Sequence, residues 1–196
     1  MTESEKEKML AGKFYIASDP VLVEERARAE RLRRRLNVTD FGDRIAYEGI
    51  LAQLLPNCAP DLWIEPPFYC DYGYNITAGE HVFFNYNCVV LDVCKVTIGS
   101  RALIGPNVQI YAALHPLDAA SRRAHLEYGK PVAIGEECWI GGGAVVCPGV
   151  TVGDRCVIGA GAVVTRDVPD DSFVAGNPAR VLRRLDDMAG DDRRIV

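Results

Sequence analysis

An aliphatic side chain returns at every sixth position along much of this chain, and this repeat constrains the fold more than any other feature. The repeated positions are Ile98, Ile104, Ile110, Ile134, Ile140, Val146, Val152, Ile158 and Val164. Glycine follows most of these residues, and a small or β-branched residue stands four positions after all of them except Ile110, as Ala144 does after Ile140. A period of six fits neither the 3.6-residue turn of an amphipathic helix nor the alternation of a half-buried strand.

The repeat instead predicts a coil of short strands. A turn every six residues, with the aliphatic side chain inward, makes each repeat one short strand, and three strands close a triangular coil. Equivalent positions should then recur every eighteen residues, as Cys138 and Cys156 do. Neighbouring coils would stack at about 4.8 Å through backbone hydrogen bonds. We therefore expect a mainly β protein, a parallel β-helix over residues 56–178, with a short C-terminal helix and tail over residues 179–196.

The first part of the chain, residues 1–55, predicts helices. Ser18 or Asp19 could cap a helix that has Pro20 at its first position. A second helix is expected over residues 43–55, because a proline follows directly and cannot comfortably continue it. We expect these helices to form a separate N-terminal segment ahead of the coils.

One insertion interrupts the repeat without shifting its phase. Ile110 and Ile134 are separated by a multiple of six, but the positions between them lack the aliphatic residues. The insertion, residues 111–131, holds His115 and His125. Stacked coils have flat faces, and catalytic residues are often on loops that a rigid scaffold holds, so we expect this loop to project and carry a site. A neutral imidazole can take a proton from a hydroxyl, which makes His115 the candidate base, although a solvent-facing loop histidine fits the residues equally well.

Composition and charge narrow the class of protein. Seven cysteines, an odd number without a CxxC pair, argue against a disulfide framework or a zinc ribbon. A net charge of −5 does not favour nucleic-acid binding, and the basic stretch of residues 24–36 fits a solvated helix with Glu24–Arg28 and Glu30–Arg34 pairs. No run reaches the ~18 apolar residues of a membrane helix, and the charged N-terminus lacks a secretory signal. We expect a cytoplasmic protein without a nucleic-acid or membrane partner.

Several stretches resemble a known family. The hexapeptide period is similar to that of the left-handed β-helix acyltransferases, although parallel crossovers are generally right-handed. Along residues 9–185 the chain resembles the maltose and galactoside O-acetyltransferases, in AGKFY, WIEPPFYCDYGYNI, FFNYNCVVLD, HPLD, WIGGGAVVCPGVTVG and GNPARVLRRL. The resemblance implies transfer of an acetyl group from acetyl-CoA, a co-substrate, to the 6-hydroxyl of a maltose- or glucose-type sugar. It also implies a homotrimer with sites between subunits.

The same resemblance implies the catalytic and acceptor residues. His115 would be the base of a direct transfer without an acyl-enzyme, and Glu127 could accept its other ring N–H. Sugar contacts are implied for Asn85, Asp92, Asp71, Glu127 and Asp19. Asp71 stands where galactoside enzymes have serine, which favours a maltose or glucose acceptor. Each has a structural alternative: Asn85 could be a corner residue, Asp92 could satisfy turn amides, and Asp19 could only cap its helix.

Cofactor contacts are likewise implied by the resemblance. They fall on Gly142, Ala160, Thr165, Arg166, Arg180, Arg183 and Trp139. Arg180 and Arg183 would bind the phosphates of coenzyme A as charge-assisted pairs. Backbone N–H groups around Gly141 and Gly142 could stabilise the oxyanion. Alternatively, the arginines belong to a solvated terminal helix and Trp139 to the core.

Two other classes of function stay open on the sequence. Some hexapeptide-repeat proteins are zinc carbonic anhydrases with three histidine ligands, and this chain has His81, His115 and His125. Our assignment has no metal site, so metal content separates the two. A non-catalytic scaffold subunit is the third possibility, and it predicts that removing His115 leaves function unchanged.

Overall fold

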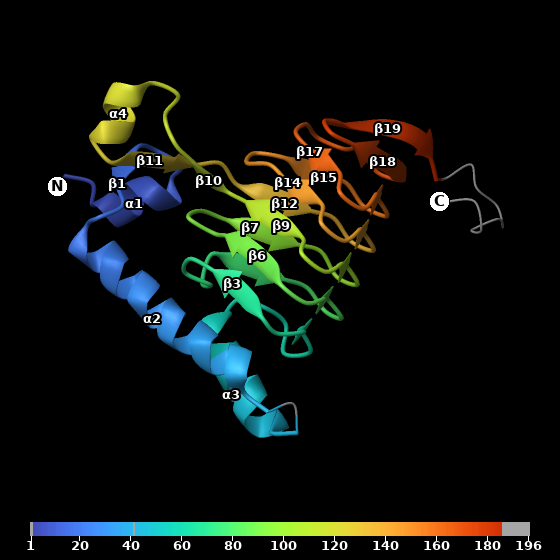
Figure 1. Ribbon diagram of the computed structural model, residues 1–196, viewed down its shortest axis with the longest axis horizontal. Coiled ribbons are helices and arrows are strands. Elements are labelled where there is room, and N and C mark those ends of the chain that lie inside the picture. Colours follow the sequence, from blue (N-terminus) through green and yellow to red (C-terminus); the bar gives the residue numbers. More distant parts are fainter. Residues whose placement is uncertain (1, 41, 186–196) are drawn as a thin grey trace.

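The computed structural model, described for residues 2–40 and 42–185, winds short parallel strands into stacked coils, with helices across one end (Figure 1). Three sheets form the faces of this prism. One has four strands: β4 (Ile76–Ala78), β7 (Val96–Ile98), β12 (Val132–Ile134) and β15 (Thr151–Val152). A second has five: β3 (Phe68–Cys70), β6 (Cys88–Leu91), β9 (Gln109–Tyr111), β14 (Val145–Val146) and β17 (Val163–Val164). The third has seven: β2 (Trp63–Ile64), β5 (Phe83–Phe84), β8 (Leu103–Ile104), β13 (Trp139–Ile140), β16 (Val157–Ile158), β18 (Ser172–Gly176) and β19 (Ala179–Arg184).

The strand register confirms the predicted coil and shows where the sequence pattern is hidden. Ile140 lies opposite Ile158, eighteen positions on, as the repeat predicts. In the first coils, however, Phe84 lies opposite Ile104, twenty positions on. Two extra residues per coil widen the corners there, and for this reason the six-residue period is not visible before Ile98.

The aliphatic column is the core of the prism. All nine repeat positions are at most 2% exposed, and the small residues four positions after them are also buried. Five of the seven cysteines are buried as well. Cys138 is one of them, and its thiol donates to the carbonyl of Gly153 at 3.0 Å. The thiol therefore fills a small space and satisfies a corner carbonyl at the same time.

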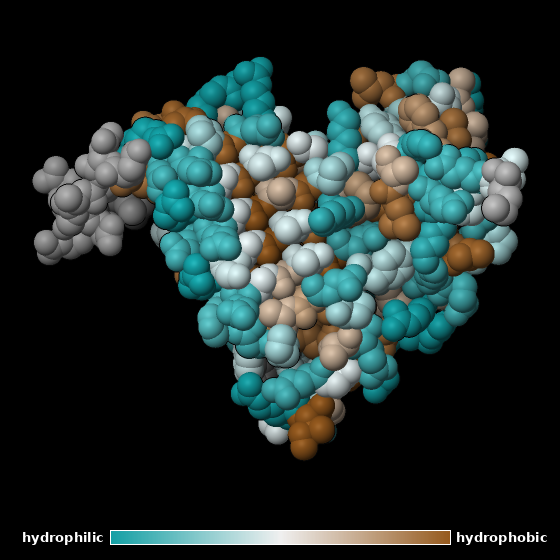
Figure 2. Space-filling model, turned by 180° about the vertical axis from the view of Figure 1, so that it is seen from behind, coloured by the Kyte–Doolittle hydropathy of each residue, from teal (hydrophilic) through white to brown (hydrophobic). Residues whose placement is uncertain are grey.

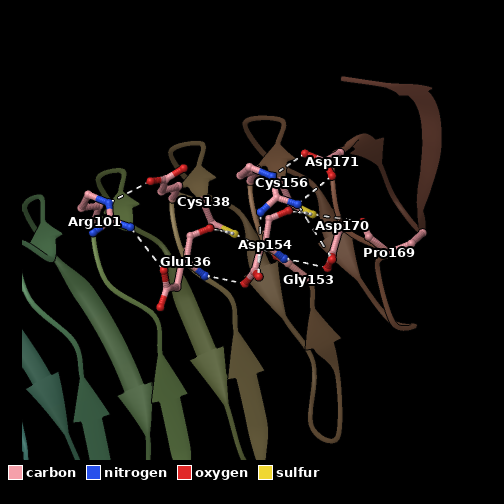
Figure 3. Close-up of polar contacts among 11 residues, drawn as sticks. Arg101, Glu136, Cys138, Gly153, Asp154, Cys156, Pro169, Asp170 and Asp171 are labelled. Carbon is pink, nitrogen blue, oxygen red and sulfur yellow. Dashed lines mark hydrogen bonds and ion pairs between the residues drawn. The ribbon is translucent and has the colours of Figure 1, made fainter. Parts of the chain in front are cut away.

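Polar side chains join successive coils at one corner (Figure 3). The carboxylate of Asp154 accepts the N–H of Glu136 at 2.8 Å, and the carboxylate of Asp170 accepts the N–H of Asp154 at 2.9 Å. Arg155 pairs with Asp171 at 2.6 Å. The carboxylates accept backbone N–H groups of the turns that the strand pairing leaves without a partner. The corner therefore adds to the rigidity of the stack.

The N-terminal segment contains α1 (Glu5–Leu10), β1 (Tyr15–Ile16), α2 (Pro20–Val38) and α3 (Arg44–Leu54). Asp19 caps α2, because its carboxylate accepts the N–H of Val21 at 3.0 Å. The predicted helices are therefore present, whereas strand β1 was not expected. Of the expected ion pairs in α2, Glu30–Arg34 forms, but Glu24 pairs with Arg31 instead of Arg28. None of the described helices combines the length and apolar character needed to cross a bilayer.

The prediction of a short C-terminal helix from residue 179 is wrong for the part of the chain that the structure describes. Ala179–Arg184 form strand β19, which turns back at Gly176 and pairs antiparallel with β18. The open edge of the last coil offers unpaired backbone groups, and pairing with them outweighs the helical pattern of the sequence. The rest of the predicted helix and tail, residues 186–196, lies outside the described residues.

The outer face of the seven-stranded sheet carries a row of apolar side chains. In-register positions on six strands form it: Trp63, Phe83, Leu103, Trp139, Val157 and Phe173. Leu103 and Trp139 are about half exposed, at 51% and 48%. Figure 2 shows the molecule from behind, where apolar side chains run in rows along the coils between more polar margins. Exposed apolar rows of this kind are typical of interaction surfaces.

Candidate active site

The insertion forms a structured arm. It comprises β10 (Ala113–Leu114), α4 (Ala119–Arg123) and β11 (Leu126–Gly129), and α4 projects from the coils in Figure 1. Strands β10 and β11 pair antiparallel, with Leu114 opposite Tyr128. The N–H of Lys130 then donates to the carbonyl of Ala112 at 2.9 Å, and this bond closes the base of the arm. The expected projecting loop is therefore a hairpin with a short helix at its tip.

A contact that the sequence did not reveal fastens this arm to the N-terminal segment. Strand β1 pairs antiparallel with β11, and Tyr15 lies opposite Glu127. Gly12 packs so closely that a β-carbon there would lie 2.8 Å from the carbonyl oxygen of Gly129. The rings of Phe14 and Tyr128 meet edge to face at 5.1 Å. Gly12, Phe14 and Tyr15 all belong to the AGKFY stretch, and this stretch was the signal in the sequence that could have pointed to the contact.

His115 follows β10 directly and lines an open pocket of about 340 Å³. The pocket is also lined by Ala17, Ser18, Val23, Arg26, Arg122, His125, Leu126 and Glu127. Leu114 lies opposite Tyr128 in the hairpin, and His115 and Glu127 stand one residue beyond this pair on the two strands' sides. The structure thus brings together the predicted base and the carboxylate expected to orient it.

Arg26 is a pocket residue that the sequence analysis missed. Its guanidinium donates to the hydroxyl of Tyr72 and to the carbonyl of Ala17, both at 2.7 Å. The segment was interpreted as a solvated helix face. Arg26, however, is four positions after Leu22 and three before Ala29, which are both buried. That spacing puts it on the inward side of α2 and was a usable signal.

Two carboxylates lie beside this pocket in different environments. Burial raises the pKa of Asp71 to about 6, and the charges of Arg26 and Arg33 work against that rise. Asp92 is fully buried, and its carboxylate accepts the N–H groups of Asp71, Tyr72 and Gly73 at 2.9, 2.9 and 2.7 Å. Asp92 therefore holds the turn that presents Asp71, as its structural alternative proposed, and shows no surface to the pocket.

The other acceptor candidates are engaged with their own backbone. The side-chain oxygen of Asn85 accepts the N–H of Tyr86 at 2.7 Å, which is a corner arrangement. Asp19 caps α2, although its neighbours Ala17 and Ser18 line the pocket. The structure does not bring Asn85 or Asp19 into contact with His115.

The candidate cofactor residues lie apart from the arm. Ala160, Thr165 and Arg166 are exposed near the last coils, and Arg180 and Arg183 stand on β19. In Figure 1, β17–β19 and α4 are well separated. One chain therefore does not bring the base and these residues together.

Four of the candidates lie on or beside β13 and β19. Trp139 is half-exposed rather than part of the core. The N–H of Gly141 is already donated to the carbonyl of Ile158 at 2.7 Å, so its expected oxyanion role is wrong. The N–H of Gly142 has no hydrogen-bond acceptor among the described residues and stays available. The guanidinium of Arg183 stacks on the ring of Phe173 at 5.2 Å.

The three histidines do not form a metal-binding group in the described part of the chain. His81 pairs with Asp61, with 2.6 Å between Nδ1 and Oδ2, whereas His115 and His125 line the pocket of the arm. Within residues 2–40 and 42–185, no three histidine, cysteine or acidic side chains gather as metal ligands would.

Stacked coils built from six-residue repeats, with a histidine-bearing arm, define a hexapeptide-repeat transferase. Residues 131–166 match the family model for the bacterial transferase hexapeptide (six repeats), and residues 8–59 match the maltose acetyltransferase hexapeptide capping motif. The chain belongs to the hexapeptide-repeat acetyltransferases.

Three relatives illustrate the similarity. Over 181 residues the chain is 53% identical to Nodulation protein L from Rhizobium meliloti (strain 1021), covering 92% of this chain and 99% of the relative. A maltose O-acetyltransferase from Clostridium difficile 630 has a similar structure, with a TM-score of 0.91, 49% identity, and coverage of 93% of this chain and 97% of the other. A galactoside acetyltransferase in complex with coenzyme A aligns with a TM-score of 0.90 and 34% identity, covering 98% and 97% of the two chains.

Proposed function

We propose that this protein transfers an acetyl group from acetyl-CoA to a sugar hydroxyl in the cytoplasm, the 6-hydroxyl of a maltose- or glucose-type acceptor. The observation that carries the proposal is the presence of His115 and Glu127 in one pocket, on an arm that two strand contacts hold in place. The structural similarity to a maltose O-acetyltransferase and to a coenzyme A complex supports the donor and the class of acceptor.

The mechanism follows from the chemistry of the pocket. The sugar hydroxyl attacks the carbonyl carbon of the thioester while His115 takes its proton. The tetrahedral oxyanion collapses, the C–S bond breaks, and the imidazolium returns the proton to the leaving thiolate. Glu127 accepts the second ring N–H and stabilises the imidazolium during the step. The free N–H of Gly142 is a candidate donor to the oxyanion.

A direct transfer fits the state of the cysteines better than an acyl-enzyme. Burial raises the pKa of Cys58, Cys88 and Cys94 to about 11 in each case. A thiol with such a pKa holds little thiolate at neutral pH and is a poor nucleophile. These three thiols are therefore unsuited to form an acyl-enzyme, which agrees with direct transfer of the acetyl group from sulfur to the sugar oxygen.

The acceptor side of the pocket suits a polyhydroxyl compound. Glu127 and Arg26 line the pocket and offer a carboxylate and a guanidinium for hydroxyl groups, and Asp71, close enough to feel the charges of both, adds a second carboxylate beside it. With its pKa raised to about 6, Asp71 is mostly ionised at neutral pH, and its carboxylate can accept hydrogen bonds from sugar hydroxyl groups. The same arrangement supports a maltose- or glucose-type acceptor.

A trimer would complete the site. The candidate cofactor residues and the arm lie apart within one chain, so a second copy has to supply the donor side next to His115. The half-exposed row that includes Leu103 and Trp139 is available for such contacts. We propose a homotrimer with the cofactor between subunits, and sedimentation of the purified protein tests it.

The activity test is a panel of sugars with acetyl-CoA, followed through release of the thiol. We expect the highest turnover with maltose or glucose. His115→Ala should lower turnover by about 10²–10⁴-fold while the circular dichroism spectrum stays unchanged. Normal acetylation by this variant would overturn the assignment of the base. Stoichiometric zinc without thiol release would instead favour the carbonic anhydrase alternative.

A further inference from the structure

A tyrosine from the N-terminal segment reaches the carboxylate of Glu127. Tyr15 and Glu127 are directly paired residues of β1 and β11, so their side chains share one face of the small sheet. The tyrosine hydroxyl donates to Oε2 of Glu127 at 2.8 Å. His115 follows β10 directly and lines the same pocket as Glu127, so Tyr15, Glu127 and His115 come from neighbouring segments of the small sheet and its edge.

The ring of Tyr15 is fixed in place. It is 1% exposed and belongs to a small core with Met9, Leu22, Tyr72 and Val93. Burial and the adjacent carboxylate of Glu127 raise the pKa of Tyr15, so the phenol stays protonated at neutral pH and acts as a donor. Its hydroxyl therefore holds one oxygen of the carboxylate in a defined position.

The second oxygen of Glu127 is free for the pocket. Among residues 2–40 and 42–185, Oε1 of Glu127 makes no hydrogen bond, and the side chain lines the same pocket as His115. We propose that Tyr15 is a positioning residue: its hydroxyl fixes the Glu127 carboxylate, and this carboxylate in turn orients the imidazole of His115. The inference rests on the proposed acetyl transfer and adds the N-terminal strand to its machinery.

The proposal has an electrostatic consequence. A hydrogen bond from Tyr15 withdraws part of the negative charge of the carboxylate. Without it, Glu127 would attract the protonated imidazole more strongly, and His115 would hold its proton to a higher pH. The other titratable or charged groups around them come from α2, the turn after β3, and the arm: Arg26, Asp71, Tyr72, Arg122 and His125. These groups stay the same when only the hydroxyl is removed.

The test compares two tyrosine-to-phenylalanine variants. Tyr15→Phe keeps the buried ring and removes the bond to Glu127. Tyr74→Phe removes a bond of the same kind, from Tyr74 to Glu25 at 2.6 Å, away from the pocket. We expect Tyr15→Phe to lower kcat roughly tenfold, with a smaller effect on the KM for sugar. The acid limb of its pH profile should also move to higher pH, whereas Tyr74→Phe should match the unchanged protein in both respects.

A double-mutant cycle shows whether Tyr15 acts through Glu127. If it does, adding Tyr15→Phe to Glu127→Gln should change kcat little further. Independent losses that multiply would overturn the proposal, as would a Tyr15→Phe variant with unchanged kcat and pH profile.

A measurement independent of turnover separates this proposal from the proposed function. The ring protons of His115 are followed by NMR against pH, and their signal is the one lost in His115→Gln. A midpoint that rises in Tyr15→Phe and not in Tyr74→Phe supports the linkage even if no sugar is acetylated. Equal midpoints in all three proteins would overturn it.

Discussion

Asp92 offers a sharp test of how the acceptor turn is held. Its Oδ1 accepts the N–H groups of Asp71 and Tyr72, and its Oδ2 accepts the N–H of Gly73. Asp92→Asn keeps the size of the side chain but has only one acceptor oxygen. If that oxygen keeps the first two bonds, the new NH₂ group points at the N–H of Gly73, and two donors face each other.

The expected loss of stability in Asp92→Asn follows from these contacts. A hydrogen bond to a charged group contributes about 1.5–3 kcal/mol, and a buried donor left without an acceptor costs a similar amount. Burial raises the pKa of Asp92 to about 7, and the amide removes that cost of burying a charge, so we take the lower end of the range. A loss of about 2 kcal/mol corresponds to a fall in Tm of roughly 4–8 °C for a chain of this size.

Thermal unfolding at neutral pH, together with sugar kinetics, measures the effect. Asp71→Asn is the matched control, because its carboxylate takes part in none of the three turn bonds, and it should raise the KM for sugar without lowering Tm. The reasoning would be refuted if Asp92→Asn left Tm unchanged but raised the KM for sugar. That pair of results would show a carboxylate that contacts the acceptor.

Four further predictions concern the coils, helix α3 and Asp71. Ile140→Ala should lower the free energy of unfolding by about 2–5 kcal/mol in urea, because Ile140 is 0% exposed in the core column. Gly135→Ala should cost about 1–3 kcal/mol in the same assay, because a β-carbon there would lie 2.6 Å from the carbonyl carbon of Gly153. Gly49→Ala, whose β-carbon meets nothing within 4 Å, should instead stabilise helix α3 by up to about 1 kcal/mol. Finally, the pKa of Asp71 is raised from 3.8 to about 6, so the folded state holds this proton more tightly than the unfolded state. Its contribution to stability is therefore largest at acid pH and is lost as pH rises from about 4 to about 6, and Tm measured against pH should fall less steeply in Asp71→Asn.

The prism was predictable because its pattern is local and repeated. Each aliphatic residue from Ile98 to Val164 points inward for the same reason, and one insertion does not disturb the phase. The first coils were less visible, because corners of unequal length shift the register from eighteen to twenty residues.

The pairing of distant segments was not predictable in the same way. Strand β1 has two residues, and its partner lies more than a hundred positions away. No local pattern selects such a partner. The same is true of β19, whose sequence is compatible with a helix but lies beside an open sheet edge.

The candidate site was only partly predictable for this reason. His115 was expected because it sits in the insertion and Glu127 because of the resemblance to the O-acetyltransferases, and both line one pocket. Tyr15 and Arg26 come from the N-terminal segment and enter the site only through tertiary contacts. Asp92 shows the opposite case, since a polar residue near the site serves the backbone.

The hairpin of β18 and β19 also covers the last coil of the column. A column of stacked coils could in principle add further coils, or another molecule, at its last open rung. Here the chain doubles back over that rung, and the edge strand β19 carries charged side chains such as Arg180, which disfavour pairing with a further strand. With α2 and α3 lying across the other end, growth into fibres is discouraged at both ends, and association is left to the sides of the column.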